Sequence, residues 1–373
     1  MTTETSLTPV LDGADVVICC GSGGVGKTTT AAVLGLQAAE LGRRAVVVTI
    51  DPARRLADAL GLPDGLTSEP TRIDLGGGRT APKGELWAMM LDPAAAFDAL
   101  VRRNATDQEQ IDRILSNPFY RNMSRTLSGT QEYMAAETLY QLHDDERFDL
   151  VVVDTPPSRN ALDFLEAPSV LARFLDHRLF RLLMMPARRG MRVMNAATQP
   201  ILRATGKVVG SDVLADAVAF FQSFAGMEAG FRTRADVVIG LLRSDATRYV
   251  VVASPHRDTV TEAAWFVDQL VDQGIDAVAG VANRVHPRFG EGTAAGARKA
   301  GDAAEAEGDV ERAALWHNVA ELRALAEAAE QELAPFAELL DEGPLGRVPL
   351  LAGDVHDLAT LEEIRRHLFP TSS

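Results

Sequence analysis

Cysteine is nearly absent from this sequence of 373 residues, in which the only two cysteines are the neighbours Cys19 and Cys20. They lie in an apolar run that we expect to form a strand, where adjacent side chains point to opposite faces and cannot readily form a disulfide. A disulfide framework and a cysteine-type zinc site are therefore excluded. We expect two small buried side chains in a protein of the reducing cytosol.

Positive charge and long apolar runs are also scarce. The 52 Asp and Glu residues outnumber the 37 Lys and Arg residues, which gives a formal net charge of −15 at pH 7. A protein that follows a phosphate backbone needs a positive surface, so we expect no nucleic-acid partner. No uncharged apolar run approaches the length of a bilayer span, and the polar residues 1–14 do not resemble a secretory signal. These absences predict a cytoplasmic protein.

The sequence does contain a series of short apolar runs rich in β-branched residues, separated by helical patterns. Near-continuous apolar strands that alternate with helices are typical of a mostly parallel sheet covered on both faces. The sequence therefore predicts a doubly wound α/β fold, with strands at residues 16–20, 45–50, 86–91, 150–153, 249–253, 277–282 and 347–350.

A glycine-rich loop follows the first of these runs. Its spacing, G-x-x-x-x-G-K-[ST], lets successive backbone N–H groups turn toward phosphate oxygens, and the dipole of the following helix adds to the attraction. Strand, loop and helix (residues 29–41) occur in the required order, which favours a P-loop over an ordinary glycine-rich turn. We expect its lysine to neutralise the outer phosphates of a nucleoside triphosphate and its threonine to bind Mg²⁺. The loop consists of Gly21, Ser22, Gly23, Gly24, Val25, Gly26, Lys27 and Thr28.

Two acidic residues follow other predicted strands. Because ligands of such sheets bind at the carboxyl ends of the strands, we expect Asp51 and Asp154 to lie near the loop. Asp154 is expected to hold Mg²⁺, usually through water, and a helix N-cap is the alternative. Asp51 is expected to orient the water that attacks the γ-phosphate; alternatively, it caps a helix that starts at Pro52.

Long helical segments interrupt the predicted sheet. Helical insertions are expected at about 93–142 and 161–243, and an alanine- and glutamate-rich stretch at about 292–340 is typical of a helix pair. No linker rich in proline, glycine or serine divides the chain. We therefore expect residues 1–373 to form a single P-loop ATPase domain with an inserted helical subdomain.

The second insertion contains a basic, methionine-rich segment at residues 170–210, in which Asp176 is the one acidic residue. Its apolar residues recur at helical spacing, and core packing is the commonest cause of such a stripe. Flexible methionines also suit a surface that binds a hydrophobic client helix, and a basic amphipathic helix suits an anionic membrane surface. All three interpretations stay open.

The chain resembles one protein family in four motifs, which occur along the chain in the same order as in that family. They are similar to the motifs of the arsenite-pump (ArsA) ATPases, a family that includes the guided-entry (GET) ATPases, which carry tail-anchored membrane proteins. The resemblance implies a P-loop NTPase fold, ATP and Mg²⁺ as ligands, and a nucleotide-dependent dimer. The motifs occupy residues 21–30, 51–53, 154–165 and 348–351.

The same resemblance implies roles for individual residues. It gives Asp51 the role of positioning water and makes Thr29 a contact of the α-phosphate. It also implies that adenine is held by Asn283, after a late strand, and by the loop that contains Pro349 and Leu350. From the periodicity of the sequence alone, Asn283 would be a polar strand end and Pro349 a turn that ends a strand.

The chain departs from the family pattern in its P-loop and in its cysteines. The family carries a lysine where this chain has Ser22, and that lysine crosses a dimer interface to the partner's nucleotide; here the chain resembles an actinobacterial branch without it. We therefore hypothesise a heterodimer with a paralogous ATPase that keeps the lysine, with a homodimer as the alternative. A competing idea is that Arg54 or Arg55 supplies the positive charge of the missing lysine, or that hydrolysis is simply slow. The cysteines of the zinc clasp and of the arsenite site are also missing.

The leading hypothesis is a cytoplasmic, Mg²⁺-dependent, dimeric ATPase that couples nucleotide state to the binding of a hydrophobic or membrane-protein client. One alternative is a catalytically weak, nucleotide-binding regulatory subunit of a heterodimer. A third, ranked below these, is a membrane-partitioning ATPase. Such proteins usually end in a basic amphipathic helix, whereas here residues 358–368 have some basic residues and the chain then ends in a polar Pro-Thr-Ser-Ser.

Overall fold

The computed structural model describes most of the chain, in two compact units. The first is formed within Met1–Met90, Asp145–Ala161 and Asp245–Ser373, and the second within Leu91–Asp144 and Leu162–Ser244. The basic segment predicted at 170–210 lies outside the described residues. The described residues are 6–51, 53–76, 83–118, 120, 130–157, 166–167, 216, 219–220, 222–224, 226–275, 277–340 and 343–370.

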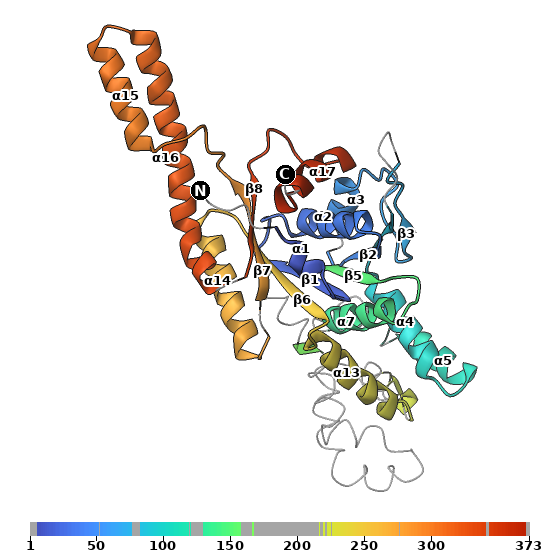
Figure 1. Ribbon diagram of the computed structural model, residues 1–373. Coiled ribbons are helices and arrows are strands. Elements are labelled where there is room, and N and C mark those ends of the chain that lie inside the picture. The colour runs from blue at the N-terminus through green and yellow to red at the C-terminus, as the bar shows by residue number, and fades with distance from the viewer. Residues whose placement is uncertain are drawn as a thin grey trace. The chain divides into compact units, whose positions relative to one another are not determined.

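The first unit is built on an eight-stranded sheet with the strand order β3-β4-β2-β5-β1-β6-β7-β8 (Figure 1). All neighbouring strands are parallel except β3 and β4. This confirms the mostly parallel α/β sheet predicted from the sequence. The strands are β1 (Val16–Gly21), β2 (Arg44–Thr49), β3 (Thr71–Arg72), β4 (Glu85–Met90), β5 (Leu150–Asp154), β6 (Thr247–Ala253), β7 (Ala277–Val285) and β8 (Leu345–Pro349).

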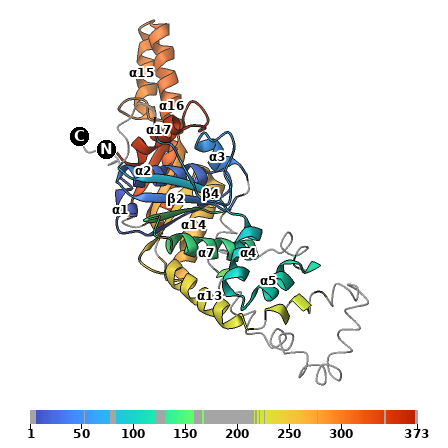
Figure 2. The same ribbon diagram turned by 90° about the vertical axis from the view of Figure 1, so that its right-hand side faces the viewer.

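Helices cover both faces of this sheet (Figures 1 and 2). On one face α2 (Lys27–Glu40) packs against β1, β2, β4 and β5, and α17 (Leu358–Leu368) packs against α2 and β8. On the other face α14 (Arg257–Asp272) packs against β1, β6 and β7. Close packing of α2 requires a glycine at position 35, because a Cβ on Gly35 would lie 2.5 Å from Cγ2 of Val47.

The short helices α1 (Thr8–Leu11) and α3 (Arg55–Ala59) also belong to this unit. A longer hairpin of α15 (Ala294–Ala306) and α16 (Val310–Leu339) extends away from the sheet beyond β8 (Figure 1). The two helices fall within the predicted stretch at 292–340. Gly308 makes the tight turn between them, with a φ angle of 82° that favours glycine.

The second unit is helical where it is described. Glu137 is fully buried in it, and its two carboxylate oxygens accept hydrogen bonds of 3.0 Å from Nε of Arg234. The guanidinium of Arg234 lies 3.8 Å from the ring centre of Tyr140. Removing one partner of a buried ion pair is strongly destabilising, because the other charge is left buried without compensation. The helices are α4 (Pro93–Asn104), α5 (Gln108–Leu115), α7 (Thr130–His143) and α13 (Glu228–Leu242).

Each of the seven predicted strands corresponds to an observed one, with bounds that differ by one to three residues. The two-residue strand β3 was not expected, and β7 continues to Val285 instead of ending at Ala282. Cys19 and Cys20 are buried and free, as predicted. The ranges of the second unit nearly coincide with the predicted helical insertions, while the single-domain organisation stays a prediction. Among the described residues, no helix combines the length and the apolar character that a membrane span requires.

Candidate functional site

The glycine-rich loop predicted from the sequence connects β1 to α2, within the first unit. Gly24 and Gly26 have φ angles of 78° and 102°, in a region that L-residues with side chains rarely adopt. At Gly26 the need for glycine is also steric, because a Cβ there would lie 2.1 Å from Nδ2 of Asn283. The loop therefore leads into α2 with its first N–H groups, which have no partner inside a helix, beside a cavity.

Lys27 lies at the start of α2 and is folded back onto the loop. Only 7% of its surface is exposed, and its Nζ donates a hydrogen bond of 2.8 Å to the carbonyl oxygen of Ser22. Burial lowers the pKa of Lys27, and the nearby carboxylate of Asp154 opposes that shift. The hydroxyl of Ser22 is buried and has no hydrogen-bond partner among the described residues.

Asp154 is the last residue of β5, and the strand register sets it beside Cys19 of β1 and Thr49 of β2. Its Oδ2 accepts hydrogen bonds from Oγ1 of Thr28, at 2.7 Å, and from Oγ1 of Thr49, at 2.8 Å. Burial raises the pKa of Asp154 to about 6, against the opposing effect of these two hydrogen bonds. These contacts do not support the N-cap alternative, because the carboxylate accepts hydrogen bonds from threonine hydroxyls of two other elements and, within the described residues, not from the N–H groups of a helix that follows it.

The other oxygen of Asp154, Oδ1, is buried without a hydrogen-bond partner in the described part of the chain. An unsatisfied carboxylate oxygen beside a threonine hydroxyl is a donor set that suits a hard divalent cation. The described residues hold no group of three His, Cys, Asp or Glu side chains that would bind a metal by themselves. Such a donor set fits Mg²⁺, which usually retains waters and completes its shell with substrate phosphates.

Asp51 follows β2 and lines the same cavity. Its Oδ1 accepts a hydrogen bond of 2.9 Å from the N–H of Ala53, and its Oδ2 lies 3.4 Å from Nη1 of Arg55. The capping alternative is wrong, because α3 begins at Arg55 and its N-cap position is Arg54. Arg54 donates a hydrogen bond to the carbonyl oxygen of Pro63 and does not line the cavity. Of the two arginines considered as substitutes for the missing lysine, Arg55 is the one that lines it.

Asn283 ties the end of β7 to the P-loop. Its Nδ2 donates a hydrogen bond of 2.8 Å to the carbonyl oxygen of Val25, and its Oδ1 accepts one of 2.9 Å from the N–H of Arg284. The expectation that Asn283 follows a strand is wrong, because β7 continues to Val285. Arg284 has a φ angle of 61° and is the one non-glycine residue with positive φ in the described part. That conformation costs an arginine roughly 1–2 kcal/mol.

Pro349 ends β8, and the next residue, Leu350, continues the contact with β7. The N–H of Leu350 donates a hydrogen bond of 2.9 Å to the carbonyl oxygen of Val285, while 48% of the residue's surface is exposed. An exposed leucine beside a cavity offers an apolar surface to a flat ring.

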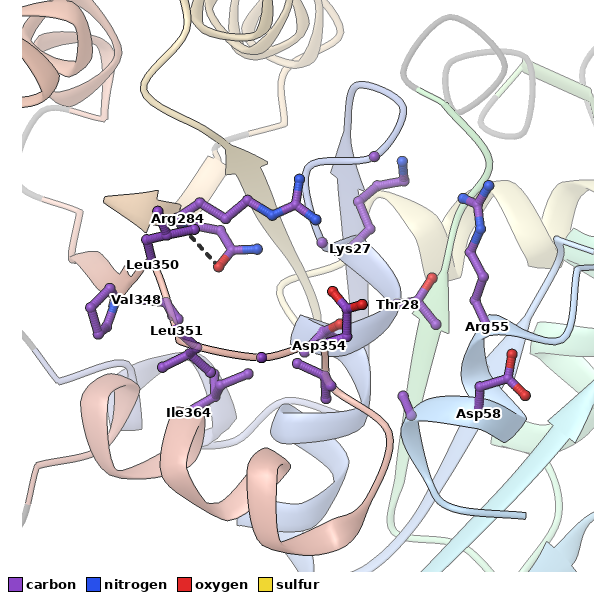
Figure 3. A pocket seen from close by; sticks show the side chains of 18 of the residues that line it. Lys27, Thr28, Arg55, Asp58, Arg284, Val348, Leu350, Leu351, Asp354 and Ile364 are labelled. Atoms are coloured by element: carbon purple, nitrogen blue, oxygen red, sulfur yellow. Dashed lines mark hydrogen bonds between the residues drawn. The ribbon is translucent and has the colours of Figure 1, made fainter. Parts of the chain in front are cut away.

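A cavity of about 750 Å³ joins these elements, a size within the usual range for small-molecule sites (Figure 3). Figure 3 shows Lys27 and Thr28 at one end and Val348, Leu350 and Leu351 at the other. The cavity is lined by nine of the predicted site residues: Gly24, Gly26, Lys27, Thr28, Thr29, Asp51, Asn283, Pro349 and Leu350.

The remaining predicted residues lie next to the cavity rather than on its wall. Asp154 accepts a hydrogen bond from Thr28, which does line the cavity. The rest of the loop consists of Gly21, Ser22, Gly23 and Val25. The structure adds residues that the sequence did not single out for the site: Thr49 behind Asp154, and Asp58, Arg284 and Asp354 on the cavity wall.

Comparison with known proteins finds a family whose model covers most of the segments that form this site. The model of the anion-transporting ATPase family, ArsA, matches residues 14–300, about three quarters of the chain. The chain belongs to this family. The match includes the P-loop, Asp51, Asp154 and Asn283, and it confirms the family resemblance predicted from the motifs.

Individual relatives are similar at modest identity. ATPase GET3 of Malassezia globosa is 31% identical over 159 residues, which are 43% of this chain and 44% of the relative. ATPase ASNA1 homolog 1 of Paramecium tetraurelia is 30% identical over 158 residues, 42% and 44% of the two chains. ATPase get3 of Aspergillus terreus is 28% identical over 267 residues, 71% of each. The matches to the first two relatives cover less than half of their length. Family membership indicates an ATPase.

Proposed function

We propose that this protein is a Mg²⁺-dependent ATPase that works as a dimer and couples its nucleotide state to the binding of a hydrophobic or membrane-protein client. The observation that carries the nucleotide part is the meeting of Thr28, Thr49 and Asp154 below a cavity lined by Lys27. The dimer and the client rest on membership of the family and on the GET3 and ASNA1 names of its relatives.

In this proposal the chain's own groups hold the triphosphate by charge and by hydrogen bonds. The N–H groups at the start of α2 and the Nζ of Lys27 bind phosphate oxygens, and Thr29 binds the α-phosphate. Lys27 lines the cavity, and on nucleotide binding its Nζ would exchange the hydrogen bond to the carbonyl oxygen of Ser22 for one to a phosphate oxygen. Asn283, Pro349 and Leu350 surround the adenine.

Thr28 and Asp154 are the residues that would hold Mg²⁺, with Asp154 acting through water. When bound, the ion would neutralise charge on the β- and γ-phosphates. Asp154 has a pKa of about 6, so it is mostly ionised at neutral pH and able to bind a cation. Thr49 keeps the carboxylate in place through its own hydrogen bond to Oδ2.

Asp51 is the residue proposed to orient the attacking water. The water adds to the γ-phosphorus while the bond from phosphorus to the β–γ bridging oxygen breaks, and ADP leaves with the electron pair. Asp51 accepts a hydrogen bond from that water, and its ion pair with Arg55 limits the positions that the carboxylate can take.

The test is phosphate release by the purified chain, measured with excess Mg²⁺ and with the metal chelated. We expect turnover that needs Mg²⁺, and we expect Asp51→Asn to abolish turnover while ATP still binds. Asp64→Asn is the matched control, because Asp64 is an exposed carboxylate on the segment after α3 and does not line the cavity. Full turnover by Asp51→Asn would contradict the assignment of Asp51.

The assembly is tested separately, because Ser22 leaves this P-loop with a single lysine, Lys27. ATP binding without turnover, followed by turnover when a lysine-bearing paralog is added, would favour the heterodimer. If Asp51→Asn leaves that turnover unchanged, the regulatory-subunit alternative is favoured. Light scattering of the chain alone with ADP and with an ATP analogue distinguishes a nucleotide-dependent homodimer from a monomer that needs a paralog. We propose a cytoplasmic location with peripheral membrane contact, and flotation with liposomes tests that contact.

A further inference from the structure

Arg284 is the cation on the cavity wall whose side chain has no acidic partner in the described part of the chain. The other two cations of the wall are engaged: Nζ of Lys27 donates to Ser22, and Nη1 of Arg55 lies 3.4 Å from the carboxylate of Asp51. Arg284 forms no ion pair and no side-chain hydrogen bond with any described residue. Its guanidinium is therefore available to an anionic ligand.

The backbone holds Arg284 in place from both sides. Asn283 is tied to the P-loop through the carbonyl oxygen of Val25, and Val285 accepts a hydrogen bond from the N–H of Leu350. Between these anchors Arg284 adopts its φ angle of 61°, which side-chain-bearing residues rarely take. Strained backbone of this kind clusters at ligand-binding positions, where the surrounding structure over-determines it.

The direction of the side chain points to a particular part of the ligand. Figure 3 shows Arg284 extending from the end of β7 across the cavity toward the loop that carries Lys27. The neighbouring Asn283, proposed to lie beside the adenine, also contacts Gly26 of the P-loop, so the backbone of Arg284 lies next to the loop that is proposed to bind the phosphates. A guanidinium presents planar donors that match phosphate oxygens in pairs.

We propose that Arg284 binds the polyphosphate of the nucleotide, as a second cation supplied from outside the P-loop. The inference rests on the proposed function, because it assumes that the cavity binds ATP. It gives the site a positive group in addition to Lys27, and it explains why an arginine occupies a backbone position better suited to glycine. Arg284 then acts as a positioning residue that holds the triphosphate between β7 and α2.

The experiment measures the affinity of the full chain for MgATP and for inorganic tripolyphosphate, by titration calorimetry and by competition. For Arg284→Ala we expect both ligands to bind about tenfold more weakly, the usual effect of losing one charge-assisted contact at an exposed site. Arg284→Lys should recover part of the affinity, since it keeps the charge but not the planar donors. Arg288→Ala is the matched control, because Arg288 is exposed four residues further on and does not line the cavity.

A glycine variant separates a lost contact from a lost fold. Arg284→Gly removes the guanidinium and also the backbone strain, so it should bind as weakly as Arg284→Ala but melt at a higher temperature. Unchanged affinity in both variants would overturn the inference, and so would a loss confined to MgATP, which would place Arg284 at the base. If the unaltered chain binds no MgATP, the proposed function itself fails, and the two failures are thus distinguishable.

Discussion

Asp154→Asn should stabilise the nucleotide-free protein and remove its response to Mg²⁺. Burial raises the pKa of Asp154 from 3.8 to about 6. One pKa unit corresponds to about 1.4 kcal/mol, so keeping this carboxylate charged at pH 7 costs the folded state about 3 kcal/mol. Asparagine removes the charge while its amide oxygen still accepts the hydrogen bonds of Thr28 and Thr49.

The pH dependence gives the prediction its sign. Between about pH 4 and pH 6 the folded state binds the proton of Asp154 more tightly than the unfolded state does. The contribution of Asp154 to the free energy of unfolding therefore falls as the pH rises through this range. At pH 7 we expect the asparagine variant to be more stable by up to about 3 kcal/mol, which is about 4 °C in melting temperature for a chain of this length. The difference should vanish below about pH 4.

The assay is denaturant unfolding of the unaltered protein and of Asp154→Asn, from about pH 4 to pH 7.5 and without nucleotide. Titrating groups that the two proteins share then largely cancel in the difference between their free energies of unfolding. Asp149→Asn is the matched control, since Asp149 directly precedes β5, at the opposite end of the strand from Asp154. The hydrogen bonds from Arg44 lower the pKa of Asp149, so its stabilisation is present at neutral pH and is lost as the pH falls. The reasoning is refuted if Asp154→Asn destabilises the protein at pH 7 or if the difference does not change with pH.

Two further predictions concern the loop and the second unit. Gly26→Ala should destabilise the protein by more than about 1 kcal/mol and abolish ATP binding, because a Cβ would collide with Asn283 at a φ angle of 102°; normal ATP affinity in calorimetry would contradict this. Glu137→Ala should cost about 3–5 kcal/mol, because it leaves the charge of Arg234 without its buried partner. Replacing both residues by leucine should recover much of that loss in denaturant unfolding, and equal losses would refute it.

The sheet was predictable because its central strands are near-continuous apolar runs. All of β1 is buried, and a strand buried on both faces cannot alternate polar and apolar residues. The edge strand β3 has two exposed residues and no such signal. The end of β7 was missed for a related reason. Asn283 and Arg284 are polar, and beyond them the pairing with β8 resumes after an irregularity, at Val285 opposite Pro349.

The site was predictable where a motif or a strand end marked a residue. Gly21 to Thr28, Asp51 and Asp154 all fall into that class, and the structure brings them to one end of the sheet. Thr49 was missed because its role depends on the register of β2 against β5, which no local pattern reveals. Arg284 was missed because its position depends on a backbone conformation set by contacts with the P-loop.

Titration calorimetry of the full chain with MgATP tests the central claim most directly, because every role proposed for the strand ends requires the nucleotide to bind there. We predict saturable binding of one MgATP to each chain, strongly weakened by Lys27→Ala. Absence of binding, or binding that Lys27→Ala leaves unchanged, would contradict a nucleotide site at this end of the sheet.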